Sequence, residues 1–228
     1  MKKKKPKNYG ECAYCGREAQ LTSDHIPPKN LFPKPRPSNL ITVPACKRCN
    51  RSASKDDEYL RLVLVMREDV YEQPAAAEVW KATFRGLKRP ESLAFTKNIL
   101  KSVSRVPAYT ESGIFAGNKA AYDVNFSRLD AVVERIIRGL FFYHSGYRLP
   151  DTHLPKSFAA EGLTDPKFWL EPEMRKPIEV VSLQPANFLG DGVFGYKFVR
   201  LADDLDSSIW LMSFYLSVFF VGFTYKKN

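Results

Sequence analysis

Four cysteines are the residues of this sequence whose type and spacing most directly indicate chemistry. Cys12 and Cys15 form one pair, Cys46 and Cys49 form a second pair with the same spacing, and the chain has no other cysteine. Two Cys-x-x-Cys knuckles from separate segments are a common way to surround a tetrahedral Zn²⁺ ion with thiolates. The spacing therefore predicts a structural zinc site, with no open position for a catalytic water.

A second group of polar residues lies between and directly after the cysteine pairs. Asp24 and His25 precede two prolines, Asn39 begins a short apolar stretch, and Asn50 follows the last cysteine. A histidine can act as a general base near neutral pH, and carboxylate and amide oxygens suit hard divalent cations. Phosphodiester hydrolysis needs a base for the attacking water and a cation for the charge that grows on the phosphoryl oxygens. The segment contains the residue types for that reaction.

Together these residues resemble the HNH, or ββα-metal, endonuclease motif over about residues 9–58. The resemblance rests on an Asp-His pair before prolines, an asparagine at the start of a second strand, and Cys-x-x-Cys-Asn at the start of a helix. It implies that Asp24 and Asn50 bind a catalytic Mg²⁺ or Mn²⁺, distinct from the structural zinc. It also implies that His25 is the general base and that Asn39 orients it.

Two positions depart from the family pattern. Asp24 stands where many members carry a histidine, and Ser54 stands where many carry a further histidine ligand. Neighbouring residues on a strand point to opposite faces, so Asp24 and His25 need a local bend or a partner segment to act together. The number of protein ligands to the catalytic ion stays open.

Positive charge is concentrated in the same part of the chain. The net charge is +10, and residues 1–58 hold 13 Lys and Arg against 6 Asp and Glu. Such a surface attracts polyanions by counterion release, so nucleic acid is the first partner to consider, and solubility is the alternative explanation of the charge. Together with the endonuclease resemblance, it makes double-stranded DNA the expected partner. Lys47, Arg51 and Lys55 lie around the start of the predicted helix, whose backbone amides also favour phosphate. Each of these side chains taken singly is typical of a solvated surface.

Several features bear on the compartment. Residues 1–8 form a lysine-rich tail with no apolar stretch behind it, so no secretion signal is predicted. The apolar run from Ile209 to Tyr225 is interrupted by polar residues and is shorter than a membrane-spanning helix. Because the four cysteines are assigned to a metal rather than to disulfides, we expect a cytoplasmic protein with no membrane partner.

The remainder of the chain has longer apolar patterns, which place a domain boundary at about residue 59. Helical spacing occurs at 76–87, at 93–103 and most clearly at 129–140, where Ser127 is the expected N-cap and Gly146 the expected end. His144 falls in the last turn of that helix and His153 in a proline-rich loop, and we assign both a structural role. Strands are expected from β-branched and aromatic content at 178–181, 193–199, 210–214 and 218–225.

The predicted fold class is therefore α+β, with a small zinc-stapled ββα-metal module at 9–58 followed by a larger mixed helical and antiparallel β domain at 59–228. That second domain has no recognised role, and a homodimer or a protein partner are both compatible with it. The Asp-His pair and the two asparagines favour a DNA endonuclease. A ribonuclease with the same site, and a zinc-stapled nucleic-acid-binding or adaptor protein without catalysis, are the alternatives.

Overall fold

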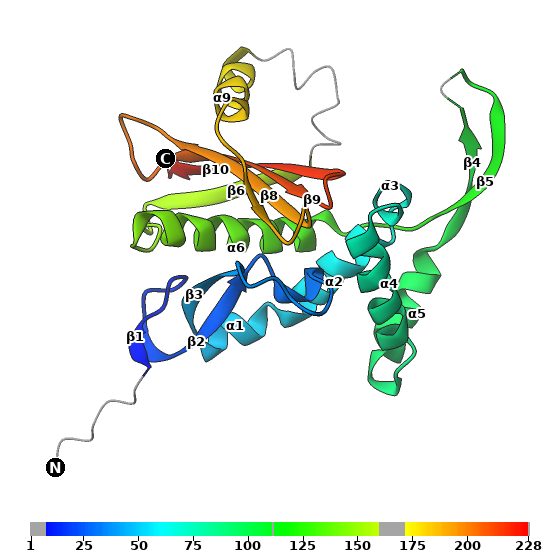
Figure 1. The fold of residues 1–228 in the computed structure, drawn as a ribbon, viewed down its shortest axis with the longest axis horizontal. Helices are drawn as coiled ribbons and strands as arrows, with labels where there is room; N and C mark the ends of the chain where they lie inside the picture. The colour runs from blue at the N-terminus through cyan, green and yellow to red at the C-terminus, as the bar shows by residue number, and fades with distance from the viewer. Residues whose placement is uncertain (1–7, 111, 160–171, 228) are drawn as a thin grey trace.

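The computed structural model describes residues 8–110, 112–159 and 172–227 (Figure 1). The predicted α+β class is confirmed, because helices are combined with three antiparallel sheets among these residues. The predicted basic tail lies outside the described residues except for Asn8. The division expected at residue 59 falls inside helix α2 (Ser54–Val65), which continues from one predicted domain into the other.

The N-terminal module consists of a three-stranded sheet followed by two consecutive helices. Helix α1 (Lys47–Ser52) begins directly after the last strand, and Cys46 caps it by accepting a hydrogen bond from the backbone N–H of Cys49. Helix α2 follows after one residue. This order of two paired strands and a helix agrees with the predicted ββα module. The sheet has the order β1 (Tyr9–Glu11), β2 (Glu18–Ile26) and β3 (Ile41–Cys46), and the short helix η1 (Lys29–Leu31) lies between β2 and β3.

Helix α6 (Phe126–Ser145) lies between the N-terminal module and the C-terminal sheet (Figure 1). A Cβ added at Gly139 would lie 2.6 Å from Ile26 Cδ1 of β2, so the helix and the module touch closely there. A Cβ added at Gly222 of the C-terminal sheet would likewise overlap Ile137 on the same helix. Because α6 contacts both layers, its apolar side chains join them into one core that extends from the module to the sheet.

The C-terminal sheet covers the other side of α6. Its strands pair antiparallel throughout. The first and last strands of this sheet in the sequence, β6 and β10, lie side by side at one edge. The ring of Phe198 stacks on Trp210 of the neighbouring strand, and Trp210 is nearly fully buried there. The five strands, in spatial order, are β6 (His153–Ala159), β10 (Val218–Lys226), β9 (Ser208–Phe214), β8 (Phe194–Arg200) and β7 (Asn187–Leu189).

Three expectations about local structure were wrong. The strand expected at 178–181 belongs to helix α9 (Pro172–Ser182), because Ile178 and Val181 are three residues apart and are buried together, while Val180 is exposed. The N-cap of α6 is Asn125, whose side chain accepts from Arg128 N, and not Ser127. His153 does not lie in a loop, because it is the buried first residue of β6. Hydrogen bonds to Asp204 and Thr152 occupy both of its ring nitrogens.

A third part of the chain extends to one side of these layers (Figure 1). It contains two antiparallel helices and a two-stranded ribbon that projects from the body, which was not predicted. No described helix is long and apolar enough to cross a membrane. The elements of this part are α3 (Glu68–Tyr71), α4 (Pro74–Leu87), η2 (Pro90–Ser92), α5 (Leu93–Ser102), β4 (Ser104–Tyr109) and β5 (Phe115–Ala121).

Candidate active site

The four cysteines meet at one point of the N-terminal module. Their Sγ atoms all lie within 4.8 Å of one another. Cys12 and Cys15 belong to the turn after β1, and Cys46 and Cys49 to the junction of β3 and α1. Four clustered sulfurs from two knuckles are the donor set of a structural Zn²⁺ site, so these residues fit the predicted ion.

Backbone N–H groups point at the sulfurs of Cys12 and Cys46. Cys46 N lies 3.3 Å from Cys12 Sγ, and Cys49 N lies 3.5 Å from Cys46 Sγ. The second contact lowers the pKa of the Cys46 thiol to about 7. Donors of this kind, which hydrogen-bond to the ligand atoms of a metal, hold the thiolates in place and tune their charge. The local cluster around the sulfurs has only Ala45 as a fully buried non-cysteine residue, so a metal replaces the core that this end of the module lacks.

Asp24 is buried on β2 and held by side chains from two other elements. The Tyr14 hydroxyl donates a hydrogen bond to Asp24 Oδ2 at 2.8 Å, and Arg135 Nη1 of α6 lies 3.3 Å from the same oxygen. Arg135 Nη2 pairs in turn with Asp57 Oδ1 of α2 at 2.6 Å. One guanidinium therefore serves two carboxylates, which leaves a surplus of negative charge in a buried position. Among the described residues, nothing donates to Asp24 Oδ1.

Burial and neighbouring charge shift the pKa values in this network. Burial raises the pKa of Asp57 to about 6, although Arg135 opposes the rise. Burial also opposes the charge of Arg135, but the two carboxylates outweigh it and raise its pKa. Burial, followed by the charge of Asp24, holds the pKa of Tyr14 far above its usual value, so the hydroxyl keeps its proton and remains a donor. Arg135 is thus a permanent cation beside the predicted metal ligand.

Replacing Arg135 with methionine is expected to lower the free energy of unfolding by about 3–5 kcal/mol near neutral pH, because two buried carboxylates lose their shared cation. The loss should be smaller near about pH 5, where Asp57 takes up a proton and loses its charge. Urea unfolding at both pH values measures the effect. Arg138→Met, on the same helix and lining the same pocket, is the control, with a cost below about 1 kcal/mol. An equal loss at both pH values would contradict this account.

His25 lies on the opposite face of β2 from Asp24. Asp24 and Ile26 are buried while His25 is partly exposed, which is the alternation expected along a strand. Burial first, and then the positive charges of Lys29 and Arg36, lower the pKa of His25 below its usual value, with Asp24 partly opposing them. The imidazole is therefore neutral at pH 7 and can accept a proton. Two cationic side chains act on it from the loop between β2 and β3.

Asn50 lies on the same side of β2 as Asp24. Its Nδ2 donates to Thr22 Oγ1 at 3.0 Å and to the Ser23 carbonyl at 3.4 Å, which fastens α1 to the strand. Thr22 and Asp24 are two residues apart and share one face of the strand. Because the amide nitrogen makes these bonds, the amide oxygen of Asn50 is the atom available to a metal.

The other predicted site residues form no hydrogen bond to Asp24 or Asn50 in the part of the chain that the structure describes. Asn39 is exposed before β3, and its Nδ2 donates to the Phe188 carbonyl of β7 at 3.3 Å. Ser54, at the position of the missing histidine, uses its hydroxyl to bond the Arg51 carbonyl at 3.0 Å. No hydrogen bond joins Asp24, His25, Asn39 and Asn50 to one another among the described residues. The predicted phosphate contacts Lys47, Arg51 and Lys55 are all exposed on α1 and α2.

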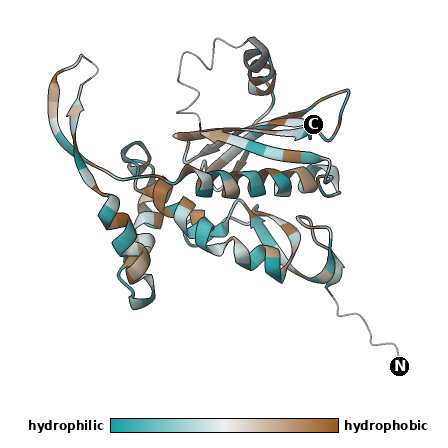
Figure 2. Cartoon of the chain, turned by 180° about the vertical axis from the view of Figure 1, so that it is seen from behind, coloured by the Kyte–Doolittle hydropathy of each residue, from teal (hydrophilic) through white to brown (hydrophobic). Residues whose placement is uncertain are grey.

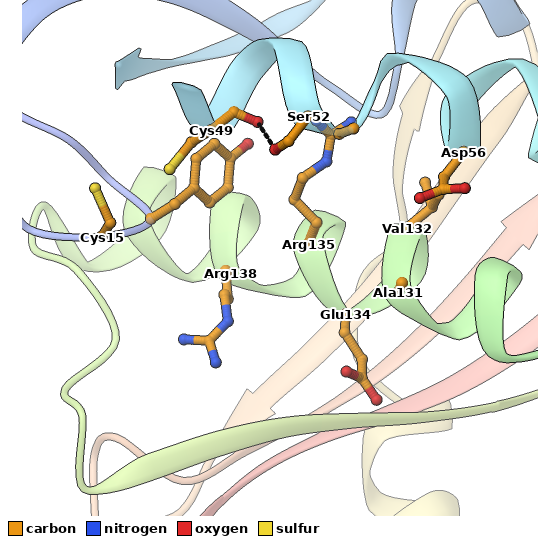
Figure 3. A pocket seen from close by; sticks show the side chains of 11 residues that line it. Cys15, Cys49, Ser52, Asp56, Ala131, Val132, Glu134, Arg135 and Arg138 are labelled. Carbon is orange, nitrogen blue, oxygen red and sulfur yellow. Dashed lines mark hydrogen bonds between the residues drawn. The ribbon is translucent and has the colours of Figure 1, made fainter. Parts of the chain in front are cut away.

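A pocket of about 400 Å³ separates the zinc-binding turn and helices α1 and α2 from helix α6. Figure 3 shows Arg135 extending from α6 toward α1, with Arg138 and Glu134 on neighbouring turns. The pocket is lined by two arginines, Arg135 and Arg138, and by two acidic residues, Asp56 and Glu134. Asp56 also pairs with Arg128 of α6 at 2.7 Å, so ion pairs tie the two helices together beside the pocket.

Sequence reasoning missed Tyr14, Asp57, Arg135, Lys29 and Arg36. Tyr14 lies between two cysteines of one knuckle, which places it beside the metal site by chain connectivity alone. Lys29 and Arg36 belong to the basic loop that follows the prolines. Arg135 carried the weakest signal, a single charge at the edge of the apolar stripe of α6.

Comparison with known proteins gives one match. No curated protein and no solved structure matches the chain. Residues 12–56 match the HNH endonuclease family. The matched residues begin at the first cysteine and end in α2, so they include all four cysteines, Asp24, His25 and Asn50. The chain therefore carries an HNH endonuclease segment with a four-cysteine cluster able to hold zinc.

Proposed function

We propose that this protein is a metal-dependent endonuclease that hydrolyses phosphodiester bonds, and that its substrate is DNA rather than RNA. The single observation that carries the proposal is the arrangement around β2. A buried carboxylate and an amide lie on the face covered by α1, and a neutral imidazole stands on the adjacent residue. The arrangement lies within the segment that matches the HNH endonuclease family.

Asp24 and Asn50 are the residues that would hold the catalytic ion. Both offer hard oxygen donors, which suit Mg²⁺ or Mn²⁺ better than the sulfur ligands of the zinc cluster do. With Tyr14 and Arg135 both on Oδ2, Oδ1 of Asp24 is the oxygen left for a cation. The negative surplus of Asp24 and Asp57 against Arg135 favours a cation there. The ion would supply positive charge against the phosphoryl and leaving oxygens.

His25 takes the role of general base in this proposal. It removes a proton from the attacking water, which requires the neutral imidazole that its lowered pKa provides. In an in-line displacement the attacking and leaving oxygens lie on opposite sides of phosphorus. A base and a metal site on opposite faces of one strand suit that geometry, with the phosphate at the strand's end. Lys29 and Arg36 would hold the phosphate, and the role of Asn39 in orienting His25 stays a prediction.

The exposed side chains of Lys47, Arg51 and Lys55 would contact the nucleic-acid backbone beside the reacting phosphate. The residues after 58 would position the substrate or form a dimer or a protein interface. A zinc-stapled binding or adaptor protein without catalysis is the rival function. It shares the zinc cluster and the basic surface, so only a test of hydrolysis separates the two.

The test is incubation of the purified full-length chain with supercoiled plasmid in Mg²⁺, in Mn²⁺, and in chelator followed by excess Mg²⁺. We expect nicked or linear product with either ion, none in chelator, and recovery when Mg²⁺ is restored. A parallel incubation with single-stranded and duplex RNA tests the preference for DNA. A chain that shifts DNA on a gel but cuts nothing with any of these ions would support the rival function.

A further inference from the structure

A long segment between the two buried parts of the chain has no buried residue of its own. From residue 84 to residue 128, every described position is exposed or partly exposed, although Thr83 before it and Leu129 after it are buried. The segment is nevertheless regularly folded. It contains the end of α4, all of α5, and the ribbon of β4 and β5, which we together call the arm (Figure 1).

Elements of this size need a partner to be stable in water. A two-stranded ribbon is marginal when isolated, and helix α5 contacts the body through Phe95 and Ile99 while its other apolar side chains stay exposed. Large apolar side chains on the arm are exposed, including Leu100 at 64%, Ile114 at 66% and Tyr109 at 62%. Figure 2 shows both hydrophobic and hydrophilic residues along the ribbon. The arm therefore presents surface that a second molecule would cover.

Charge identifies the kind of partner. The arm, residues 84–121, holds seven Lys and Arg against two Asp and Glu, whereas the other residues after 58 hold 15 Lys and Arg against 17 Asp and Glu. All the net positive charge outside the N-terminal module thus lies on the arm. Lys97 and Lys101 are exposed four residues apart on α5, on one helix face, and Arg105 follows them at the base of the ribbon. Such a cationic surface is complementary to a polyanion, not to a second copy of itself.

The shape of the arm fits duplex DNA. A two-stranded β-ribbon is narrow enough to enter a DNA groove, and apolar side chains at such tips can wedge between base steps. The ribbon ends in Tyr109, Ile114 and Phe115, and the rings of Tyr109 and Phe115 pack edge to face with centroids 5.9 Å apart. Lys119 of β5 forms an ion pair with Glu68 of α3, which fixes the base of the ribbon to the body.

We propose that the arm is a second DNA-binding surface, in which Lys97, Lys101 and Arg105 contact phosphates and the ribbon tip enters a groove of duplex DNA. The arm lies at the end of the molecule opposite β1 and the zinc-binding turn, so it contacts the duplex away from the cleaved bond (Figure 1). The proposal rests on the proposed function in taking DNA as the substrate, but it concerns binding and not hydrolysis.

The test measures binding of a labelled duplex by fluorescence anisotropy between about 50 and 200 mM salt. It uses the full chain in a His25→Ala background, so that the duplex stays intact. A charge variant combines Lys97→Ala, Lys101→Ala and Arg105→Ala. Its matched control removes the exposed lysines 176, 226 and 227, which lie on α9 and at the C-terminal end of the chain. A tip variant combines Ile114→Ser with Phe115→Ser.

The charge variant should bind at least about tenfold more weakly and show a log–log salt slope that is shallower by about 2–3, one for each lost phosphate contact. The tip variant should bind about five- to tenfold more weakly with an unchanged salt slope, because it loses no charge. The lysine control should bind like the parent chain. Circular dichroism and zinc content, unchanged in all variants, establish that each chain is folded.

Two results would overturn the proposal. One is duplex binding by both arm variants that equals that of the control. The other is a parent chain that sediments as a dimer and becomes a monomer in the tip variant without any change in DNA affinity, which would assign the arm to a second copy. Plasmid cleavage is scored separately with His25 restored. If the chain cleaves plasmid but the arm variants bind DNA like the control, only this inference is overturned. If the arm binds duplex DNA but the chain does not cleave it, only the proposed hydrolysis is overturned.

Discussion

Replacing His25 with alanine should lower the rate of plasmid cleavage by about a thousandfold while duplex binding and zinc content stay unchanged. The expected size is that of a lost general base, which contributes about 10²–10⁴ to a rate. The side chain is partly exposed and forms no hydrogen bond with the described residues, so its removal should leave the fold intact. Cleavage rates at saturating protein and Mg²⁺ measure the effect.

A neighbouring substitution separates chemistry from local structure. Thr42→Ala removes the exposed residue that pairs with His25 across β2 and β3, and it should cut within about threefold of the wild-type rate. Added imidazole should restore part of the activity of His25→Ala and leave Thr42→Ala unaffected, because it can take the place of the missing base. Retention of more than about a tenth of the wild-type rate by His25→Ala would remove His25 from the role of base.

The features that could be predicted well from the sequence are those that depend on short stretches of chain. The cluster of four sulfurs could be predicted because each Cys-x-x-Cys knuckle is local in the sequence. Only the contact between the two knuckles depends on the fold. The helix at 129–140 was predicted because an apolar residue recurs at helical spacing over three turns, and Gly146 ends it with a positive φ. Local patterns of this kind do not depend on the rest of the fold.

The features that were missed depend on contacts between distant segments. Arg135 lies 111 residues after Asp24, and no local pattern shows that α6 packs against β2 closely enough for the two side chains to meet. The ribbon of β4 and β5 has little apolar alternation, because neither face is buried in the chain itself. Helix α9 was mistaken for a strand because a run of four residues, three of them β-branched, is too short to distinguish helical from strand periodicity.

Arg135 also changes how the predicted metal site is understood. The sequence presented Asp24 as a free carboxylate, whereas the structure shows one of its oxygens held by a tyrosine and an arginine. An anchored carboxylate has a fixed direction, and fixed ligands lower the entropic cost of binding an ion. The larger C-terminal part thus contributes directly to the geometry of the N-terminal module, because its longest helix carries the anchoring side chain.

Replacing Cys46 with serine should remove zinc from the purified chain and lower the free energy of unfolding by at least about 4 kcal/mol. Cys46 is buried, accepts the N–H of Cys49 at the start of α1, and lies 3.9 Å from the sulfur of Cys15. Without the ion, little apolar contact remains to hold the turn after β1 against the start of α1, because the cluster there is built mainly from the cysteines themselves. Metal analysis and urea unfolding measure the two effects.

The same substitution should abolish plasmid cleavage, and excess Mg²⁺ should not restore it, because α1 carries Asn50 and loses its anchored start. Asp24→Asn separates the two metals: it should lose cleavage as well, yet keep its zinc and resist unfolding far better than Cys46→Ser. Limited proteolysis should cut the Cys46→Ser chain within residues 9–50 and leave the C-terminal sheet intact, since the aromatic side chains of that sheet pack against one another. A Cys46→Ser chain with full zinc content and wild-type unfolding would show that the four sulfurs do not share an ion.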